Sequence, residues 1–163
     1  MTRPDIDPDL FRQLLGRFAT GVTVLTTRDA QGGVVGMTAS SLASVSLVPP
    51  LVSVCVDVSA DMHRALSASG DFVINILAAH QEDLSRRFAA ESPEERFRGI
   101  DWRETPSGLV VLAGVLAHIE CERFADFPLG DHTLFVGRVT GGASQEGEPL
   151  LYFRGSYGAL HRP

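Results

Sequence analysis

A strictly alternating segment in the first half of the chain is the strongest constraint on its fold. Between Leu51 and Val58 every second residue is valine, while Ser53, Cys55 and Asp57 occupy the positions in between. Because successive side chains of a β-strand point to opposite faces, this spacing predicts a strand with one apolar and one polar face. We expect the valine face to enter a core and the polar face to meet a polar ligand or solvent.

Further β-patterns predict that the whole chain is mainly β. The β-branched run Val22–Thr27 and the segment Val34–Val45 flank the turn residues Asp29–Gly33, a pattern typical of a hairpin. Other strands are predicted at Phe72–Leu77, Val110–Phe124, Thr133–Val139 and Leu150–Leu160. About six or seven strands with a few short helices favour an antiparallel barrel with helical additions.

The first of three expected helices follows Asp9, which can cap it, and ends near Gly21. Apolar residues recur along it at helical spacing and form one stripe, which we expect to serve packing. The stripe consists of Leu10, Phe11, Leu14, Leu15 and Phe18.

Two more helices are expected in the middle of the chain. The segment Asp61–Ala68 has a helical pattern that Gly70 would end. The segment Gln81–Ala90 is the second, and it carries Glu82 and Arg86 at the spacing of a favourable ion pair.

The length of 163 residues predicts one domain that covers residues 1–163. The segment Glu91–Ser107 is rich in charge and contains two prolines. Too little chain follows it for a second domain, so we interpret it as a mobile surface excursion rather than a linker.

All fourteen basic residues are arginines, and twenty acidic residues bring the net charge to −6. The absence of lysine excludes a Schiff base and a P-loop lysine. An acidic balance without a basic field argues against nucleic acid and anionic membranes as partners. Any anion bound by this chain must rest on arginine, hydroxyls or backbone N–H groups.

The two cysteines, Cys55 and Cys121, have no CxxC spacing, and the acidic start lacks the basic and apolar regions of a signal peptide. The longest apolar run, Leu109–Ala117, is less than half of the roughly 20 residues that a membrane span needs. We therefore expect a cytoplasmic protein that does not cross a membrane.

Motifs for several chemistries are missing from the sequence. The five histidines form no HxxxH pair and no short-range pair with cysteine, so no metal site is predicted. There is no GxGxxG, no P-loop and no GxSxG elbow. Hydrolytic catalysis has no visible nucleophile.

Seven pieces of sequence, in order, resemble the flavin reductase family, the small partners of two-component flavin-dependent monooxygenases. The resemblance covers about residues 11–160 and rests on several short motifs taken together. They include Gly16–Val24, Gly36–Ser41, Pro49–Asp57, Ser69–Asn75, Leu84–Ala89, Gly130–His132 and Pro149–Gly158.

The resemblance implies an FMN-binding split β-barrel, antiparallel and Greek-key-like, with a few short flanking helices and a homodimeric assembly. It also implies an NAD(P)H:flavin oxidoreductase that reduces FMN or FAD with NADH, or with NADPH, and passes reduced flavin to a separate monooxygenase. Hydride passes directly between the two cofactors, so no catalytic acid or base is required. The alternative is an electron-carrier or flavin-storage protein on the same barrel.

The resemblance assigns cofactor contacts to two neighbouring segments. Short hydroxyl side chains and backbone groups along the flavin permit close approach, and they are Met37, Thr38, Ala39, Ser40 and Ser41. The polar strand borders the flavin ring, mostly through backbone groups, at Ser53, Val54, Cys55 and Val56. A serine-rich strand edge is the alternative reading of the first segment, and packing that of Cys55.

A third group of contacts departs from the family pattern. Ser59 and His63 match a segment that approaches the flavin phosphate, but the loop holds Asp61 and no arginine before Arg64. We interpret Asp61 as a helix N-cap. The phosphate could instead be held by arginine on the next helix, where the candidates are Arg86, or Arg87, beside Phe88 and Ala89.

His132, in the motif Gly130-Asp131-His132, is expected to contact the nicotinamide nucleotide at the open face of the flavin. Asp131 is expected to orient the loop or the imidazole rather than to transfer protons. A structural hydrogen bond is the alternative role for His132.

Overall fold

The alternating valine segment forms strand β5, Pro50–Asp57, in the computed structural model, which describes residues 5–161. Val54 and Val56 are buried, as the alternation predicted, and Val52 is half-buried. Val58 was expected on the same buried face but lies beyond the strand and is 52% exposed, because the chain turns after Asp57. Strand β5 pairs antiparallel with β10, His132–Ser144, along one edge and with the shorter β4, Ala43–Leu47, along the other.

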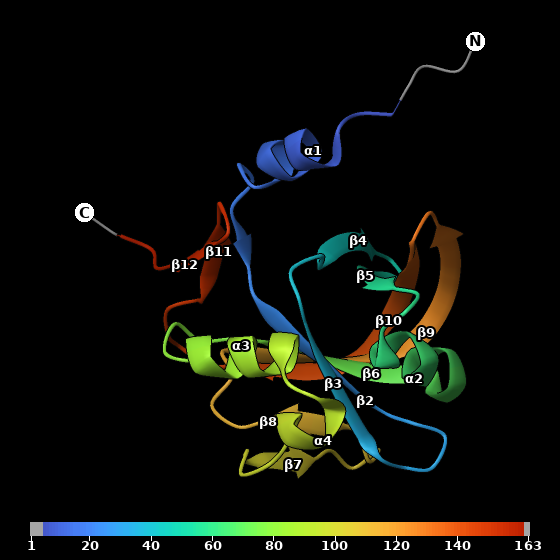
Figure 1. Ribbon diagram of the computed structural model, residues 1–163. Coiled ribbons are helices and arrows are strands. Elements are labelled where there is room, and N and C mark those ends of the chain that lie inside the picture. Colours follow the sequence, from blue (N-terminus) through green and yellow to red (C-terminus); the bar gives the residue numbers. More distant parts are fainter. Residues whose placement is uncertain (1–4, 162–163) are drawn as a thin grey trace.

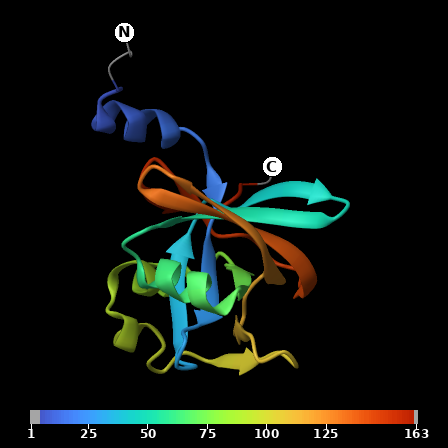
Figure 2. The same ribbon diagram turned by 90° about the vertical axis from the view of Figure 1, so that its right-hand side faces the viewer.

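Seven strands form one antiparallel sheet in the order β3-β2-β6-β9-β10-β5-β4. The strands not yet introduced are β2 (Thr23–Arg28), β3 (Val34–Ala39), β6 (Asp71–Ile76) and β9 (Ala117–Leu129). The sheet curls, so that residues from β2, β3, β5, β6, β9 and β10 share one inner core with helix α2, Asp61–Ser69 (Figures 1 and 2). The predicted fold class, mainly β with an antiparallel barrel, is confirmed.

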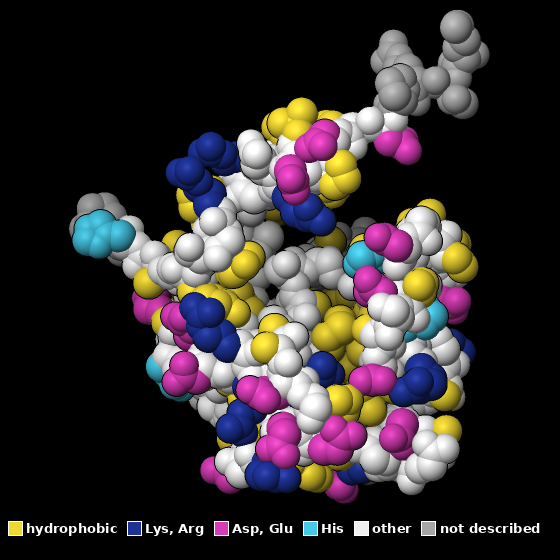
Figure 3. All heavy atoms as spheres, in the orientation of Figure 1, with side chains coloured by type: hydrophobic (Ala, Val, Ile, Leu, Met, Phe, Trp, Pro, Cys, Tyr) yellow, Lys and Arg dark blue, Asp and Glu magenta, His cyan; other side chains and the backbone are white. Residues whose placement is uncertain are grey.

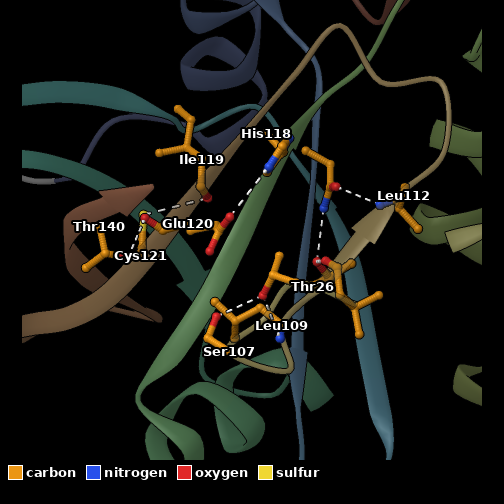
Figure 4. Close-up of polar contacts among 12 residues, drawn as sticks. Thr26, Ser107, Leu109, Leu112, His118, Ile119, Glu120, Cys121 and Thr140 are labelled. Carbon is orange, nitrogen blue, oxygen red and sulfur yellow. Dashed lines mark hydrogen bonds and ion pairs between the residues drawn. The ribbon is translucent and has the colours of Figure 1, made fainter. Parts of the chain in front are cut away.

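The outer face of β2 and β6 carries a second core. Val24 and Val73 point outward, and helix α3, Glu82–Ala90, covers them with strand β8, Val110–Leu112. The buried amide of Asn75 donates to the backbone of β2 and accepts the N–H of Leu112, so one side chain ties β8 to the barrel wall. Figure 4 labels Leu112 and Thr26, the two residues that this amide joins. The middle of the sheet is therefore buried on both faces.

The predicted surface excursion 91–107 contains structure of its own. It forms the short helix α4, Pro93–Arg96, and strand β7, Trp102–Glu104, which pairs with β8. Arg96 donates to the carbonyl of Gly36 at 2.9 Å, and the Phe97 ring packs edge-on against the buried Phe88. The excursion thus covers the outside of β3.

A small three-stranded sheet lies at one end of the barrel. Its strands are β1 (Thr20–Gly21), β11 (Leu151–Phe153) and β12 (Ser156–Gly158), in the order β1-β11-β12. It joins the start of the chain to its end, because Thr20 pairs with Tyr152.

The first helix, α1, differs from its prediction in two ways. It spans Pro8–Leu15, and its N-cap is Asp7 rather than Asp9. The Asp7 carboxylate accepts the backbone N–H groups of Asp9 and Leu10 at 3.0 Å each. It ends at Gly16 rather than near Gly21. The chain turns at residues 16–18 and leads into β1, which begins at Thr20, so the helix cannot continue to Gly21.

The apolar stripe of α1 does not pack into the core of this chain. Its residues are 45–74% exposed, and the helix stands away from the barrel (Figure 1). Helical spacing shows that a face is apolar but not what covers it. Within residues 5–161 no helix is long and apolar enough to cross a membrane.

Helix α2 begins as predicted but is not capped by Asp61. Ala60 occupies the N-cap position without a side-chain bond, and the Asp61 carboxylate accepts from Arg64 at 2.7 Å instead. Gly70 ends the helix with φ of 83°, the left-handed conformation that glycine adopts without a steric penalty.

Candidate functional site

The serine-rich segment, Met37–Ser41, ends β3 and leads toward β4, and it is held between α3 and β5. Thr38 donates its hydroxyl to the carbonyl of Ser85 at 2.7 Å. Ser41 lies on the other side, where its Oγ accepts the Cys55 N–H at 2.9 Å and donates to the Cys55 carbonyl at 3.2 Å. Two hydroxyl groups thus bring β3, α3 and β5 together around the serine-rich segment. Ser40, between them, is exposed.

Along β5 the backbone of Val54–Asp57 extends beyond the pairing with β4, which stops at Ser53. The Ser53 side chain is almost buried and Cys55 is half-buried, while Val54 and Val56 belong to the inner core. The valines can therefore contribute to a ligand site only through their backbone. On the predicted polar face of this strand, Cys55 and Asp57 are half-buried, whereas Ser53 is buried.

Asp57 ends β5 and organises the turn that follows. Its carboxylate accepts both the backbone N–H and the hydroxyl of Ser59 at 2.7 Å. These contacts hold the pKa of Asp57 below its ordinary value. The hydrogen bond from the Ser59 hydroxyl has the largest effect, the bond from the backbone N–H comes next, and the nearby His132 and His63 add to both. An ionised carboxylate is therefore a fixed feature of this end of the strand.

The two predicted histidines lie on either side of this turn. His63 Nε2, on α2, bonds Thr133 Oγ1 at 2.9 Å, and its ring packs edge-on against Phe135. His132 pairs in register with Asp57 across the sheet, and its Nδ1 lies 2.7 Å from the carboxylate of the exposed Asp131. The imidazole of His132 remains partly exposed, so its other ring nitrogen can meet a ligand.

Helix α3 presents the remaining predicted residues in different environments. The Arg86 guanidinium pairs with Glu82 at 2.6 Å, as the spacing predicted, and lies 4.7 Å from the centre of the Tyr157 ring. Arg87 donates to the carbonyl of Arg98 at 2.7 Å, which joins α3 to the excursion 91–107. The Phe88 side chain is fully buried in the outer core, so its own contribution is packing, and Ala89 is exposed.

The structure therefore places the predicted residues in two neighbouring groups. One group surrounds the serine-rich segment, and its members are Met37, Thr38, Ala39, Ser40, Ser41, Ser53, Val54, Cys55, Val56 and Arg86. The other lies at the end of β5 and consists of Ser59, His63, Asp131 and His132. Strand β5 runs from one group to the other.

Four polar residues at the site were not among the predicted cofactor contacts, although Asp57 was placed on the polar face of its strand. Asp57 holds the turn through Ser59, and Thr133 bonds His63. The buried Ser85 shares a 2.8 Å hydrogen bond with the Tyr157 hydroxyl. The Asp57-x-Ser59 spacing, which is typical of a side-chain turn, could have revealed Asp57. Ser85 and Tyr157 are 72 residues apart, and no local signal joins them.

Neither cysteine is paired in a disulfide. Burial raises the pKa of the Cys121 thiol to about 12, which keeps it protonated and unreactive. Among residues 5–161, His, Cys, Asp and Glu side chains do not gather in groups of three or more that could hold a metal ion.

Comparison with known proteins gives the family of this chain. Residues 15–161 match the family described as "Flavin reductase like domain". The sequence is 43% identical to the reductase subunit HsaB of a flavin-dependent monooxygenase from Rhodococcus jostii, over 93% of this chain and 77% of that protein. It is 42% identical to the FMN reductase (NADH) SmoA of Agrobacterium fabrum, over 93% of this chain and 86% of that protein.

Solved structures agree with the sequence comparison. The NADH:FAD oxidoreductase of Streptomyces globisporus, solved in complex with NAD and FAD fragments, superposes with a TM-score of 0.89 at 36% identity. The match covers 98% of this chain and 98% of that chain. The chain therefore belongs to the flavin reductase-like domain family.

Proposed function

We propose that this protein is an NAD(P)H:flavin oxidoreductase that reduces FMN or FAD and supplies diffusible reduced flavin to a separate monooxygenase. The observation that carries the proposal is the convergence of the serine-rich segment, β5 and α3, held together by the Thr38 and Ser41 hydroxyls. Family membership and the NADH-dependent flavin reductases among its relatives support the same reaction.

The residues of this surface fit a flavin. The hydroxyls of Ser40 and Ser53 have no hydrogen-bond partner within residues 5–161, so they are available to an amide-like ring edge or a ribityl chain. The small side chain of Ser40 allows close approach to the backbone, whereas Ala39 belongs to the inner core and can contribute only through its backbone. Bound flavin supplies the acceptor for the hydride of the nicotinamide cofactor.

The protein's own contribution is binding and orientation. Ser41 fixes the serine-rich segment against β5, and Thr38 fixes it against α3. We assign His132 to the nicotinamide nucleotide, with Asp131 orienting its ring through the Nδ1 contact. No group need move a proton in this scheme, because the two rings must only be held at near-attack distance.

Steady-state turnover tests the proposal directly. The loss of NADH absorbance is followed in air, with and without added FMN, and then with FAD and with NADPH. Turnover that rises with free flavin supports a diffusible-flavin reductase. A protein that binds flavin but does not oxidise NADH or NADPH would be a carrier or storage protein, and the reductase assignment would be wrong.

A single substitution tests the assignment of His132. His132→Ala is expected to raise the KM for NADH about two- to tenfold, the loss that accompanies one net hydrogen bond, while flavin affinity stays the same. His80→Ala is the matched control, since His80 is exposed and lies outside the site. An equal effect of both substitutions contradicts the assignment.

We also propose that the protein is a cytoplasmic homodimer. The exposed apolar side chains of α1 form a patch that a second copy could cover (Figure 3). Leu47 and Val48, beside β4, are 85% and 88% exposed and extend the apolar surface of the molecule. Both cysteines are free, which suits a reducing compartment. Sedimentation of the intact protein tests the dimer, and a monomer at micromolar concentration would refute it.

A further inference from the structure

A pocket lined by three arginines lies between the end of α1 and the turn that joins β11 to β12. Its volume is about 420 Å³, and its lining residues are Arg12, Gln13, Gly16, Arg17, Arg154 and Gly155. The N–H of Arg154 donates to the carbonyl of Gly16 at 3.0 Å, so backbone contact joins the two walls. Figure 3 shows arginine side chains gathered around this end of α1.

Two of the three guanidinium groups are free of protein partners. Most arginines in the described chain bond a carboxylate, a carbonyl or a ring, as Arg28, Arg96 and Arg123 do. Within residues 5–161 the side chains of Arg17 and Arg154 have no such partner, and Arg12 bonds only the exposed Asp9 at 2.7 Å. In a protein with a net charge of −6, this is a local excess of positive charge.

The backbone at Arg154 adds an independent observation. Arg154 has φ of 52° and the following Gly155 has φ of 77°, and Arg154 alone among the described non-glycine residues has a positive φ. A two-residue hairpin turn of this kind favours asparagine, aspartate or glycine at its first position. An arginine in this conformation is strained, and no contact within the turn offsets the strain. The strain therefore points to a role for the Arg154 side chain.

Guanidinium groups arranged around a pocket are suited to phosphate. Their planar donors bind phosphate oxygens in pairs, and arginine keeps its charge at all ordinary pH values. We propose that this pocket binds the diphosphate of a dinucleotide co-substrate, FAD or NADH, whose ring lies at the candidate site. The proposal rests on the proposed function for the identity of the ligand.

The β11–β12 hairpin connects the pocket to the candidate site. Tyr157, on β12, bonds Ser85 through its hydroxyl, and the Arg86 guanidinium lies over the Tyr157 ring. Arg154 lies in the turn of this hairpin, and Tyr157 is the middle residue of β12, so one short hairpin carries both residues. A dinucleotide joins its two halves through a diphosphate, so one molecule can occupy both places.

The pocket stays open when the apolar stripe of α1 is covered. Successive residues of a helix are 100° apart, so Arg12 and Gln13 lie on the face opposite Phe11 and Leu14. A partner on the apolar stripe would therefore leave the arginine face free. The homodimer and the phosphate pocket are compatible.

Binding of ADP tests the pocket without turnover. Calorimetry is carried out on the intact protein and on Arg17→Ala and Arg154→Asn, of which the second keeps a residue suited to the turn. Each variant is expected to weaken ADP binding at least about tenfold, as the loss of a charged hydrogen bond does. Arg98→Ala removes the same charge from an exposed ion pair with Glu95 and should leave the affinity unchanged. No ADP binding to the intact protein, or equal loss in all three variants, overturns the proposal.

Turnover then identifies the source of the diphosphate. If the pocket takes the adenylate half of FAD, Arg154→Asn raises the KM for FAD and leaves that for FMN unchanged. If it takes NADH, the KM for NADH rises with either flavin. Unchanged constants for all three overturn the assignment to a dinucleotide. Arginine-dependent ADP binding in a protein without any flavin-dependent turnover would refute the proposed function while the phosphate pocket stands.

Discussion

Replacing Ser41 by alanine should loosen the attachment between the serine-rich segment and β5. The Ser41 hydroxyl satisfies both backbone groups of Cys55, at 2.9 and 3.2 Å, at a point where β4 no longer pairs with β5. Alanine leaves this N–H and this carbonyl without a protein partner. The neighbouring Ser40 is exposed and makes no side-chain hydrogen bond in the described chain, so Ser40→Ala is a matched control.

The size of the effect follows from the two lost bonds. A net hydrogen bond contributes about 0.5–1.5 kcal/mol, and an unsatisfied buried group costs about 1–3 kcal/mol. Cys55 is half-buried, so water can replace part of the loss, and we expect Ser41→Ala to lower the free energy of unfolding by about 1–2 kcal/mol. For 163 residues the entropy of unfolding is about 0.34 kcal/mol per kelvin. The corresponding fall in Tm is about 3–6 °C.

Thermal unfolding followed by circular dichroism measures this difference. All three proteins are compared at one concentration, because the Tm of the proposed homodimer would depend on protein concentration. Ser40→Ala should stay within about 0.5 kcal/mol of the parent protein, as an ordinary surface change does. Equal Tm values for the two variants would show that the Ser41 contacts do not hold the segment, and the reasoning on the site would fail.

Three further predictions concern packing, pH and thiol chemistry. Gly36→Ala places a Cβ against the Phe88 ring, closer than van der Waals contact allows, so it should lower the free energy of unfolding in urea by about 1–3 kcal/mol. An unchanged midpoint would contradict the packing. Because the Asp57 pKa lies below its ordinary value of 3.8, its contribution to stability is present above that pH and is lost as the pH falls through the folded-state pKa. Acid unfolding of Asp57→Asn should therefore start from lower stability and change less with pH below about 4. The buried Cys121 should resist a thiol reagent in the native state, and the half-buried Cys55 should react first; equal labelling rates would refute this.

Local pattern predicted the elements whose geometry depends on neighbouring residues alone. The valine alternation gave β5, Gly70 ended α2 with a positive φ, and Glu82 and Arg86 form the expected ion pair. These features depend on strand pleat, backbone sterics and helical spacing, which operate over a few residues. The family resemblance supplied the candidate residues of the site.

Long-range contacts explain what the sequence could not predict. Ser85 meets Tyr157 only because the last hairpin folds back beside α3. Phe88 matches a family motif, but its side chain belongs to the outer core, since it faces the barrel wall. The stripe of α1 was recognised as apolar, yet its spacing carries no information on whether the same chain covers it.

The burial of β2 and β6 on both faces also determines how the molecule opens. Leu25 and Ile74 belong to the inner core and Val24 and Val73 to the outer one, and all four are 0% exposed. Local fluctuations can free α1 or the excursion 91–107 without exposing these strands, whereas opening β2 or β6 disrupts both cores at once. The backbone amides of β2 and β6 should therefore exchange their hydrogens with solvent only through global unfolding. These two strands are the last part of the sheet to open, and the strands that carry the site are attached to them.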